Sequence, residues 1–272
     1  MKARFSKICC HGCDYAVVDA VTQRVFLSQS LIGHLADRRE GIGFERIAVV
    51  EPPYDPDLDF YIRVYNASGQ EVKDCVGGIG CGAMFADRRD LTVTRRPMEI
   101  GSLCGHVTVR LEQDGVHLSV PDPVFQPSGV PFRAQSEEKT YILQVLGRNV
   151  FCSVLAVGSP YCIVEQKSEF IPQLPELAGA VSSHERFPEG CSVGFCRYLS
   201  RAEISISPVP GVDSASTALA AALAGIRSGT LDESVSSRVE DGCVRVGWHA
   251  QRPDPALCIL APRAVYDGEI EI

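Results

Sequence analysis

Residues Asn66–Phe85 read NASGQEVKDCVGGIGCGAMF, a polar turn followed by a cysteine and a glycine-rich segment. A strand-like run, Phe60–Val64, leads into the turn, and the glycine-rich segment is typical of the start of a buried helix. Free N–H groups and the positive end of a helix dipole lower the pKa of a thiol and can hold a substrate carboxylate. We therefore expect a chemical role for Cys75, a lowered pKa of its thiol, and faster alkylation than at the other cysteines. The alternative is that Cys75 and Cys81 are small buried hydrophobic residues and that the glycines only allow close packing.

Length and composition indicate a soluble globular protein that acts on a small molecule. The chain has 272 residues, of which 45% are apolar, enough for two modest cores or one large one. No apolar run approaches the length of a membrane span, and Met1–Phe5 lacks the apolar core of a signal peptide, so we expect a cytoplasmic protein with no membrane partner. The net charge of −8 argues against a nucleic-acid partner and leaves a small polar metabolite.

Twelve cysteines are scattered through the chain, and without an export signal they indicate reduced thiols rather than a disulfide framework. The segment Cys9–Cys13, CCHGC, brings three thiols and an imidazole within five residues. Because no second cluster at zinc spacing follows, we expect core and turn cysteines there and no metal site.

The order of expected elements repeats along the chain, which indicates a mixed α/β (α+β) protein of two domains. Turn and periodicity signals predict helices over 30–38, 78–88 and 174–182. They predict strands at 5–9, 15–20, 49–53, 60–65, 98–100, 107–111, 116–120, 141–145, 151–157, 162–164, 192–198, 204–207, 243–246, 256–260 and 269–272. The proline-rich passage 121–131 is the candidate crossing between domains. We therefore expect an N-terminal domain of residues 1–120 with a C-terminal strand at 263–272, and a second domain of residues 121–262.

Residues Pro208–Gly229 form a counterpart of the Cys75 segment in the second half. A polar loop is followed by a cap at Asp213 or Ser214 and by an alanine-rich helix that is too apolar to lie on a surface. On composition alone, Asp213 is either a helix cap or a catalytic base. Each half is thus expected to hold a buried helix whose N-terminus opens toward the other half.

Many short motifs occur in one order along most of the chain. They are Asp19–Gln23, Leu35–Arg38, Gly41–Phe44, Val49–Pro56, Asn66–Gly69, Glu71–Val72, Cys75, Val130–Phe132, Glu138–Tyr141, His184–Glu189 and Tyr266–Gly268. In this order they resemble the diaminopimelate epimerase family. The resemblance implies two pseudo-symmetric α/β domains, each wrapping a central helix, with an active-site cleft between them. It also implies catalysis without pyridoxal phosphate or metal, in which a cysteine of each domain flanks the α-carbon of the substrate.

The chain departs from the family at the second catalytic position. Cys75 matches the first catalytic cysteine, but Ser214 stands where the second is expected, followed by Ala215 and Ser216 in place of glycine and serine. The preceding loop, Pro208–Val212, is shorter than in the family and lacks its glycine-arginine and glutamate-threonine elements. A serine hydroxyl has a pKa far above the range useful for proton exchange, and no histidine lies nearby in sequence to activate it.

Most asparagines that bind substrate in the family are also replaced. Asn66 is retained, whereas Cys13, Gly77 and Ser192 each stand at an asparagine position, and Ser159 and Tyr161 replace the asparagine and histidine of a Gly-Asn-Pro-His motif. By resemblance the substrate-binding positions of this chain are Cys13, Asn66, Gly77, Gly78, Ser159, Ser192, Ala215 and Ser216.

The leading hypothesis is a cofactor-independent isomerase or related proton-transfer enzyme on a small amino-acid-like metabolite. Cys75 is its acid/base, and the helix mouth at Gly77 and Gly78 cradles a carboxylate. The phenazine-pathway isomerases share the family's fold and use a single acid/base, although theirs is a carboxylate. One rival is a catalytically inactive homologue that binds a ligand or partner, and another is a genuine diaminopimelate epimerase of lysine biosynthesis. A homodimer is one possibility for the assembly.

The missing thiol at Ser214 predicts that the protein does not interconvert the diaminopimelate stereoisomers. Ser214→Cys is expected to place a thiol that forms a disulfide with Cys75 on oxidation, yet epimerase turnover stays very low because the substrate is not positioned. Peptide mapping of the oxidised variant and an epimerase assay check both parts. Normal turnover by the wild-type protein would refute this assignment of the loop.

Overall fold

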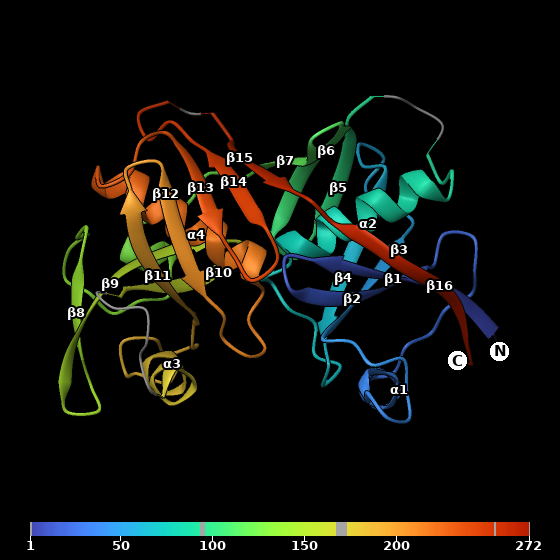
Figure 1. Cartoon of the computed structure of the whole chain (residues 1–272), viewed down its shortest axis with the longest axis horizontal. Coiled ribbons are helices and arrows are strands. Elements are labelled where there is room, and N and C mark those ends of the chain that lie inside the picture. Colours follow the sequence, from blue (N-terminus) through green and yellow to red (C-terminus); the bar gives the residue numbers. More distant parts are fainter. Residues whose placement is uncertain (1, 93–95, 167–172, 253, 272) are drawn as a thin grey trace. The chain divides into compact units, whose positions relative to one another are not determined.

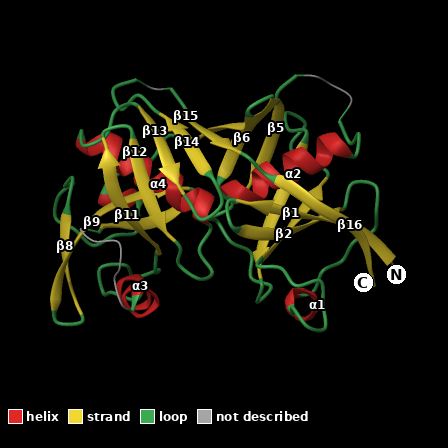
Figure 2. Ribbon diagram, viewed as in Figure 1, coloured by secondary structure: helices red, strands yellow, loops and turns green. Residues whose placement is uncertain are grey.

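The computed structural model describes residues 2–92, 96–166, 173–252 and 254–271. The chain divides into two compact units, and each is treated separately below. The first unit contains Met1–Ser119 and Ile259–Ile272, and the second contains Val120–Cys258. The described residues form sixteen strands and four α-helices, a mixed α+β architecture dominated by sheet (Figure 2).

In the first unit the hydrogen-bonded strand order is β16-β1-β2-β3-β4-β5-β6-β7. The pairs β2–β3 and β4–β5 are parallel, whereas β1–β16, β1–β2, β3–β4, β5–β6 and β6–β7 are antiparallel. The bounds are β1 Lys2–Cys10, β2 Cys13–Asp19, α1 Gln29–Ala36, β3 Arg46–Glu51, β4 Phe60–Asn66, α2 Val76–Arg88, β5 Met98–Ser102, β6 Gly105–Glu112, β7 Gly115–Val120 and β16 Arg263–Glu271.

In the second unit the strand order is β15-β14-β13-β12-β11-β10-β9-β8. The pairs β10–β11 and β12–β13 are parallel, and a helix lies in the chain between the members of each parallel pair, as in the first unit. The bounds are β8 Tyr141–Val145, β9 Arg148–Val157, β10 Ser159–Glu165, α3 Leu174–Ser182, β11 Ser192–Ser200, β12 Glu203–Ser207, α4 Ser214–Ser228, β13 Ser234–Arg238, β14 Cys243–Gly247 and β15 Ala256–Leu260, with a short 3-10 helix at Pro127–Gly129.

Each unit has one helix enclosed by its strands. Helix α2 contacts β1 to β6, and α4 contacts β9 to β14 (Figure 1). Every residue from Ala215 to Ile226 of α4 is buried, as the alanine-rich pattern predicts, because small side chains let a helix lie inside a sheet. In α2 the run Val76–Ala83 is likewise buried.

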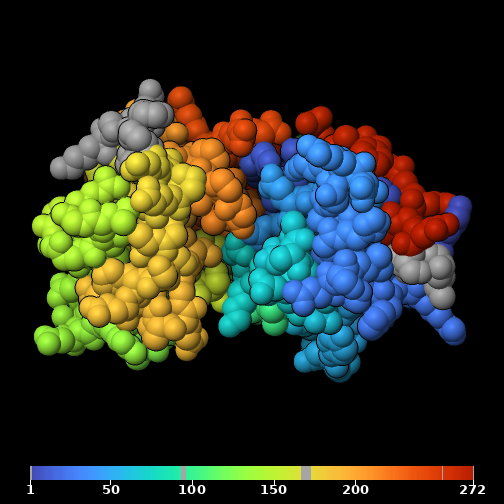
Figure 3. All heavy atoms as spheres, turned by 90° about the horizontal axis from the view of Figure 1, so that it is seen from below, coloured from blue at the N-terminus to red at the C-terminus, as the bar shows by residue number. Residues whose placement is uncertain are grey.

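The shorter helices cover the other side of the sheet in each unit. Ser28 caps α1 by accepting the N–H of Leu31, and the buried side chains of Ile32 and Leu35 pack into the core of the first unit. Helix α3 packs on β8 and β11 in the same way. In Figure 3 the blue surface of the first unit includes α1 and the yellow surface of the second includes α3.

Most expected elements are present, and the differences have physical reasons. Strand β13, Ser234–Arg238, was not predicted because the segment SVSSR lacks an apolar run, yet Val235 and Ser237 point inward and are buried. Helix α2 starts at Val76 rather than near 78. The last strand, β16, starts at Arg263, as the domain prediction of a strand at 263–272 has it, whereas the local pattern alone gave only 269–272, because long-range pairing with β1 supports residues that carry little apolar signal.

The glycines of α2 allow the helix to approach β4 closely. A Cβ on Gly78 would lie 2.5 Å from Cγ2 of Val64, and one on Gly82 would lie 2.6 Å from Cδ1 of Ile62. Gly78 therefore has a packing role, because its absent side chain faces β4.

Gly78→Ala is expected to lower the free energy of unfolding by about 1–3 kcal/mol, because overpacking outweighs the better helix propensity of alanine. Gly179→Ala in α3 is the matched control, since Gly179 is exposed and nothing lies within 4 Å of its added Cβ. The control is expected to be neutral or stabilising by up to about 1 kcal/mol. Urea unfolding measures both, and equal midpoints for the two variants would contradict the close packing of α2.

Candidate functional site

Cys75 immediately precedes the first residue of α2. Its carbonyl accepts the first helical hydrogen bond, from the N–H of Ile79 at 2.9 Å, while its thiol makes no capping bond. The residue is 1% exposed. The thiol thus lies at the N-terminal end of the central helix of the first unit without being used to cap it.

A buried ion pair fixes the chain just before Cys75. The guanidinium of Arg46, on β3, donates to both carboxylate oxygens of Asp74 at 3.0 and 2.7 Å, and also to the Asp74 carbonyl at 2.9 Å. Arg46 and Asp74 are both buried. A fork-like guanidinium that makes three bonds to one residue sets the position and direction of that residue.

A second thiol lies beside Cys75. Strands β5 and β6 are joined by a two-residue turn, Leu103–Cys104, in which Ser102 pairs with Gly105. The hydroxyl of Ser102 lies 3.9 Å from Sγ of Cys75 and 3.1 Å from Sγ of Cys104. It also accepts the N–H of Cys104 at 3.2 Å. We call Cys75 and Cys104 the thiol pair.

The pKa values of the two thiols move apart. A hydrogen bond to Cys104, followed by burial, raises the pKa of Cys75 well above the ordinary thiol value. The same hydrogen bond from Cys75, together with that of Ser102, lowers the pKa of Cys104 against the effect of burial. The expected lowering of the Cys75 pKa is therefore wrong in direction, because a partner thiol and burial outweigh the helix terminus.

The other predicted substrate-binding residues of the first unit have structural contacts. Cys13 is buried at the start of β2, and Gly77 and Gly78 are buried in the first turn of α2. The side-chain Oδ1 of Asn66 accepts the N–H groups of Ser68 and Gln70 at 3.1 and 3.0 Å and so builds the turn after β4. A substrate-binding role for these residues stays a prediction.

At the start of α4, Asp213 is the helix cap. Its carboxylate accepts the N–H groups of Ala215 and Ser216 at 3.4 and 3.2 Å and the hydroxyl of Ser216 at 2.5 Å. The capping interpretation of Asp213 is thus confirmed. Ser214 is the first residue of the helix and is half-buried. Catalytic and binding roles for Ser214, Ala215 and Ser216 stay predictions.

The remaining predicted positions lie at the starts of two adjacent strands of the second unit. Ser159 begins β10, and its buried hydroxyl makes no hydrogen bond within the described chain. Ser192 begins β11, is half-buried and is paired with Tyr161 of β10. An unsatisfied buried hydroxyl is uncommon and is compatible with a binding role for Ser159.

The CCHGC segment forms the turn between β1 and β2. Cys10 pairs with Cys13 across this two-residue turn, and Nε2 of the buried His11 accepts the N–H of Ala261 at 3.1 Å. Within the described ranges no group of three or more His, Cys, Asp or Glu side chains is arranged to hold a metal ion. His11 therefore has a structural contact that ties the turn to the chain after β15.

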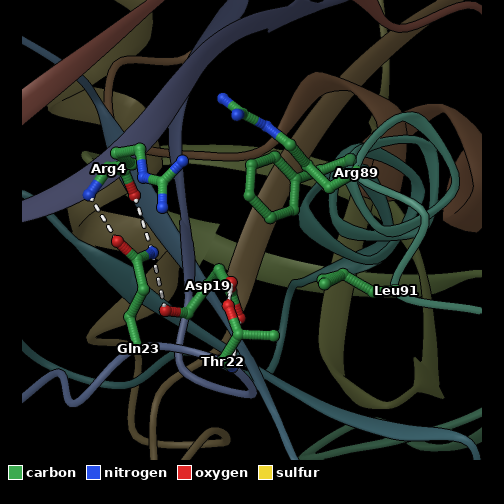
Figure 4. Close-up of a pocket in the computed structure, with 7 residues that line it drawn as sticks. Arg4, Asp19, Thr22, Gln23, Arg89 and Leu91 are labelled. Atoms are coloured by element: carbon green, nitrogen blue, oxygen red, sulfur yellow. Dashed lines mark hydrogen bonds between the residues drawn. The ribbon is translucent and has the colours of Figure 1, made fainter.

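A pocket of about 230 Å³ lies at the other end of α2 (Figure 4). Its lining residues are Arg4, Asp19, Thr22, Gln23, Phe85, Arg89 and Leu91. Asp19 accepts the N–H groups of Val21 and Thr22, and Arg89 pairs with Asp267 at 3.1 Å. These contacts stabilise the turn after β2 and the end of α2, and a 13-residue helix, about 20 Å long, separates them from Cys75.

None of the four helices, over the residues described, is both long and apolar enough to cross a membrane. No family model matches the sequence.

Three solved structures resemble the chain over almost its whole length. A hydroxyproline epimerase from Agrobacterium vitis, with bound trans-4-OH-L-proline, is 14% identical with a TM-score of 0.72, over 99% of this chain and 92% of that one. A probable proline racemase from Agrobacterium radiobacter K84, with bound carbonate, is 12% identical with a TM-score of 0.71, over 99% and 93%. A methylitaconate-delta-isomerase is 11% identical with a TM-score of 0.59, over 99% and 95%.

At these identities the likeness establishes the fold alone. The chain has the fold of these three structures. The specific resemblance to diaminopimelate epimerase stays a prediction from sequence.

Arg46→Met is expected to lower the free energy of unfolding by about 3–5 kcal/mol, because it leaves the buried carboxylate of Asp74 uncompensated. Changing Arg46 and Asp74 together to Met and Leu should recover most of that loss. Lys2→Ala is the control, since Lys2 pairs with Glu269 on the surface and should cost at most about 1 kcal/mol. Urea unfolding distinguishes these cases, and a loss at Arg46 no larger than that at Lys2 would show that the ion pair does not hold the start of α2.

Proposed function

We propose that this protein is a cofactor-independent isomerase-type enzyme that moves a proton at a carbon next to the carboxylate of a small acid. Cys75 is its acid/base. The observation that carries the proposal is a buried thiol, beside a second thiol of lowered pKa, at the N-terminus of the central helix of the first unit.

Thiols are suited to this chemistry because their ordinary pKa lies near the working pH, and the raised pKa of Cys75 keeps its thiol in the acid form in the free protein. The first turn of a helix offers backbone N–H groups and a positive dipole end, which stabilise a substrate carboxylate and the charge that develops when its α-proton leaves. Cys75 and the first turn of α2, which contains Gly77 and Gly78, supply both features in one place.

The fold supports the same reaction class. The three similar structures are named an epimerase, a racemase and an isomerase, and all three names describe the isomerisation of small molecules. Such a likeness cannot name a substrate. We infer an amino acid or a related small carboxylic acid as the substrate class.

A two-thiol epimerase of diaminopimelate is not favoured at the start of α4. Ser214 replaces the expected cysteine, and the neighbouring Asp213 carboxylate already accepts hydrogen bonds from Ala215 and Ser216. An occupied helix cap is a poor general base for the adjacent hydroxyl.

The test is hydrogen exchange in deuterium oxide, with single enantiomers of amino acids and with small unsaturated carboxylic acids as the panel. At least one compound is expected to exchange the proton on the carbon next to its carboxylate. Cys75→Ser should slow that exchange by about 10²–10⁴-fold, the usual contribution of a general acid/base. Cys243→Ser is the matched control, since Cys243 is exposed on β14 in the second unit, and it should leave the rate unchanged.

Exchange that survives in Cys75→Ser would contradict the role of Cys75. If no compound exchanges but one raises the melting temperature, the protein binds a ligand without turning it over, and the non-catalytic alternative is correct.

A further inference from the structure

We infer that Cys104 accepts the proton of Cys75 before Cys75 takes a proton from substrate, so that the thiol pair acts as a single acid/base with one shared proton and one negative charge. This inference rests on the proposed function for its catalytic meaning, but the sharing itself is a property of the free protein. Cys104 acts through Cys75 and is therefore a positioning residue.

The first argument is placement. The turn that carries Cys104 joins β5 to β6, and β5 pairs with β4 through the register Tyr61 with Gly101. The turn that carries Cys104 is thus held beside β4, the strand on which α2 also packs. Sγ of each cysteine lies within hydrogen-bond reach of one hydroxyl, that of Ser102.

The second argument is burial. Cys75 is 1% exposed and Cys104 is 9% exposed. Two thiolates in contact in such a place would repel each other with little screening, whereas a thiol beside a thiolate is a charge-assisted hydrogen bond. Once the pair has lost one proton, the remaining proton is therefore shared between the two sulfurs, and the pair titrates as a unit.

The charged groups around the thiol pair are compatible with one thiol beside one thiolate. Asp74 precedes Cys75 and opposes a charge on Cys104, but Arg46 is paired with that carboxylate. Tyr61 on β4 is within electrostatic range of both thiols, and burial raises its pKa, so it is a neutral neighbour at pH 7. The hydroxyl of Ser102 can donate either to Cys104 or to the carbonyl of Gly105 at 3.0 Å.

The proton balance of the step follows from the shared proton. The S–H bond of Cys75 breaks as an S–H bond forms on Cys104. The Cys75 thiolate then takes the substrate proton, its S–H bond re-forms as the C–H bond breaks, and the electron pair stays on the substrate beside its carboxylate. The charge of −1 has moved from the thiol pair to the substrate, and the reverse steps restore it.

A consequence is that the pair serves one face of the substrate. Because both sulfurs lie within hydrogen-bond reach of the same Ser102 hydroxyl, they are not placed as the two opposed bases of a racemase. Return of the proton from this pair retains configuration or shifts a double bond on the same face.

The test is limited alkylation of the full-length reduced protein with iodoacetamide over a pH series, followed by peptide mapping. Cys104 is expected to react at lower pH than Cys243, which is exposed and serves as the ordinary thiol within the same molecule. At pH values below the ordinary thiol pKa, Cys75→Ser and Cys75→Ala should each slow alkylation of Cys104 by roughly tenfold or more. Tenfold corresponds to the smallest pKa shift, about one unit, expected of two groups that share a proton.

Ser102→Ala should slow alkylation of Cys104 by a smaller factor, because one hydrogen bond to the thiolate is lost while that from Cys75 remains. The rate at Cys243 should not change in any variant, and a melting temperature close to that of the wild-type protein shows that a variant is folded. The inference would be overturned by equal pH profiles of alkylation for Cys104 and Cys243 in the wild-type protein. It would also be overturned if neither Cys75 substitution changed the alkylation rate of Cys104.

The exchange assay separates this inference from the proposed function. Cys104→Ser should move the pH dependence of α-proton exchange to higher pH. If exchange requires Cys75 but its pH profile is unchanged in Cys104→Ser, the inference of a shared proton is wrong and the proposed function is still supported. If alkylation of Cys104 behaves as expected but no compound exchanges its proton, the shared proton is supported and the proposed isomerase function is wrong.

Discussion

The bonds between Arg46 and Asp74 are the constraint on which the candidate site depends. They tie the middle of the first unit's sheet to the residue before Cys75, and they do so with three bonds inside a buried environment. Charged groups at such a position are costly to bury unless they are fully paired. Their pairing fixes where α2 begins and hence where the thiol of Cys75 lies.

The remaining geometry follows from close packing against β4. The absent side chains of Gly78 and Gly82 let α2 lie directly on Val64 and Ile62, and β4 in turn pairs with β5. The short turn after β5 then brings Cys104 to Cys75. The position of α2, the pairing of β4 with β5 and the short turn after β5 together place the two sulfurs near each other. None of these features is a chemical motif by itself.

Much of the fold could be predicted because its signals are local. The glycine-rich α2, the alanine-rich α4 and the alternating strands 98–120 have periodicities that distinguish helix from strand. Strand β13 could not be found in this way, because its polar residues are stabilised by pairing with β12 and β14 and not by an apolar run of their own.

The site was predicted only in part for the same reason. The position of Cys75 at a helix N-terminus follows from the sequence, but the direction of its pKa does not, because it depends on Cys104, which lies 29 residues away. The only sequence signal for Cys104 is that a cysteine precedes the turn glycine Gly105, a weak pattern in a chain with twelve cysteines. The ion pair between Arg46 and Asp74 could not be predicted either, because it depends on the position of β3 beside α2.

The central claim is that the thiol pair holds one proton and one charge. The most direct measurement is the ultraviolet absorbance of thiolates across pH in the wild-type protein, minus that of a variant in which both Cys75 and Cys104 are changed to serine. The account predicts that one thiolate appears below the ordinary thiol pKa and that the second appears only well above it. Two thiolates that appear together near the ordinary value would contradict it.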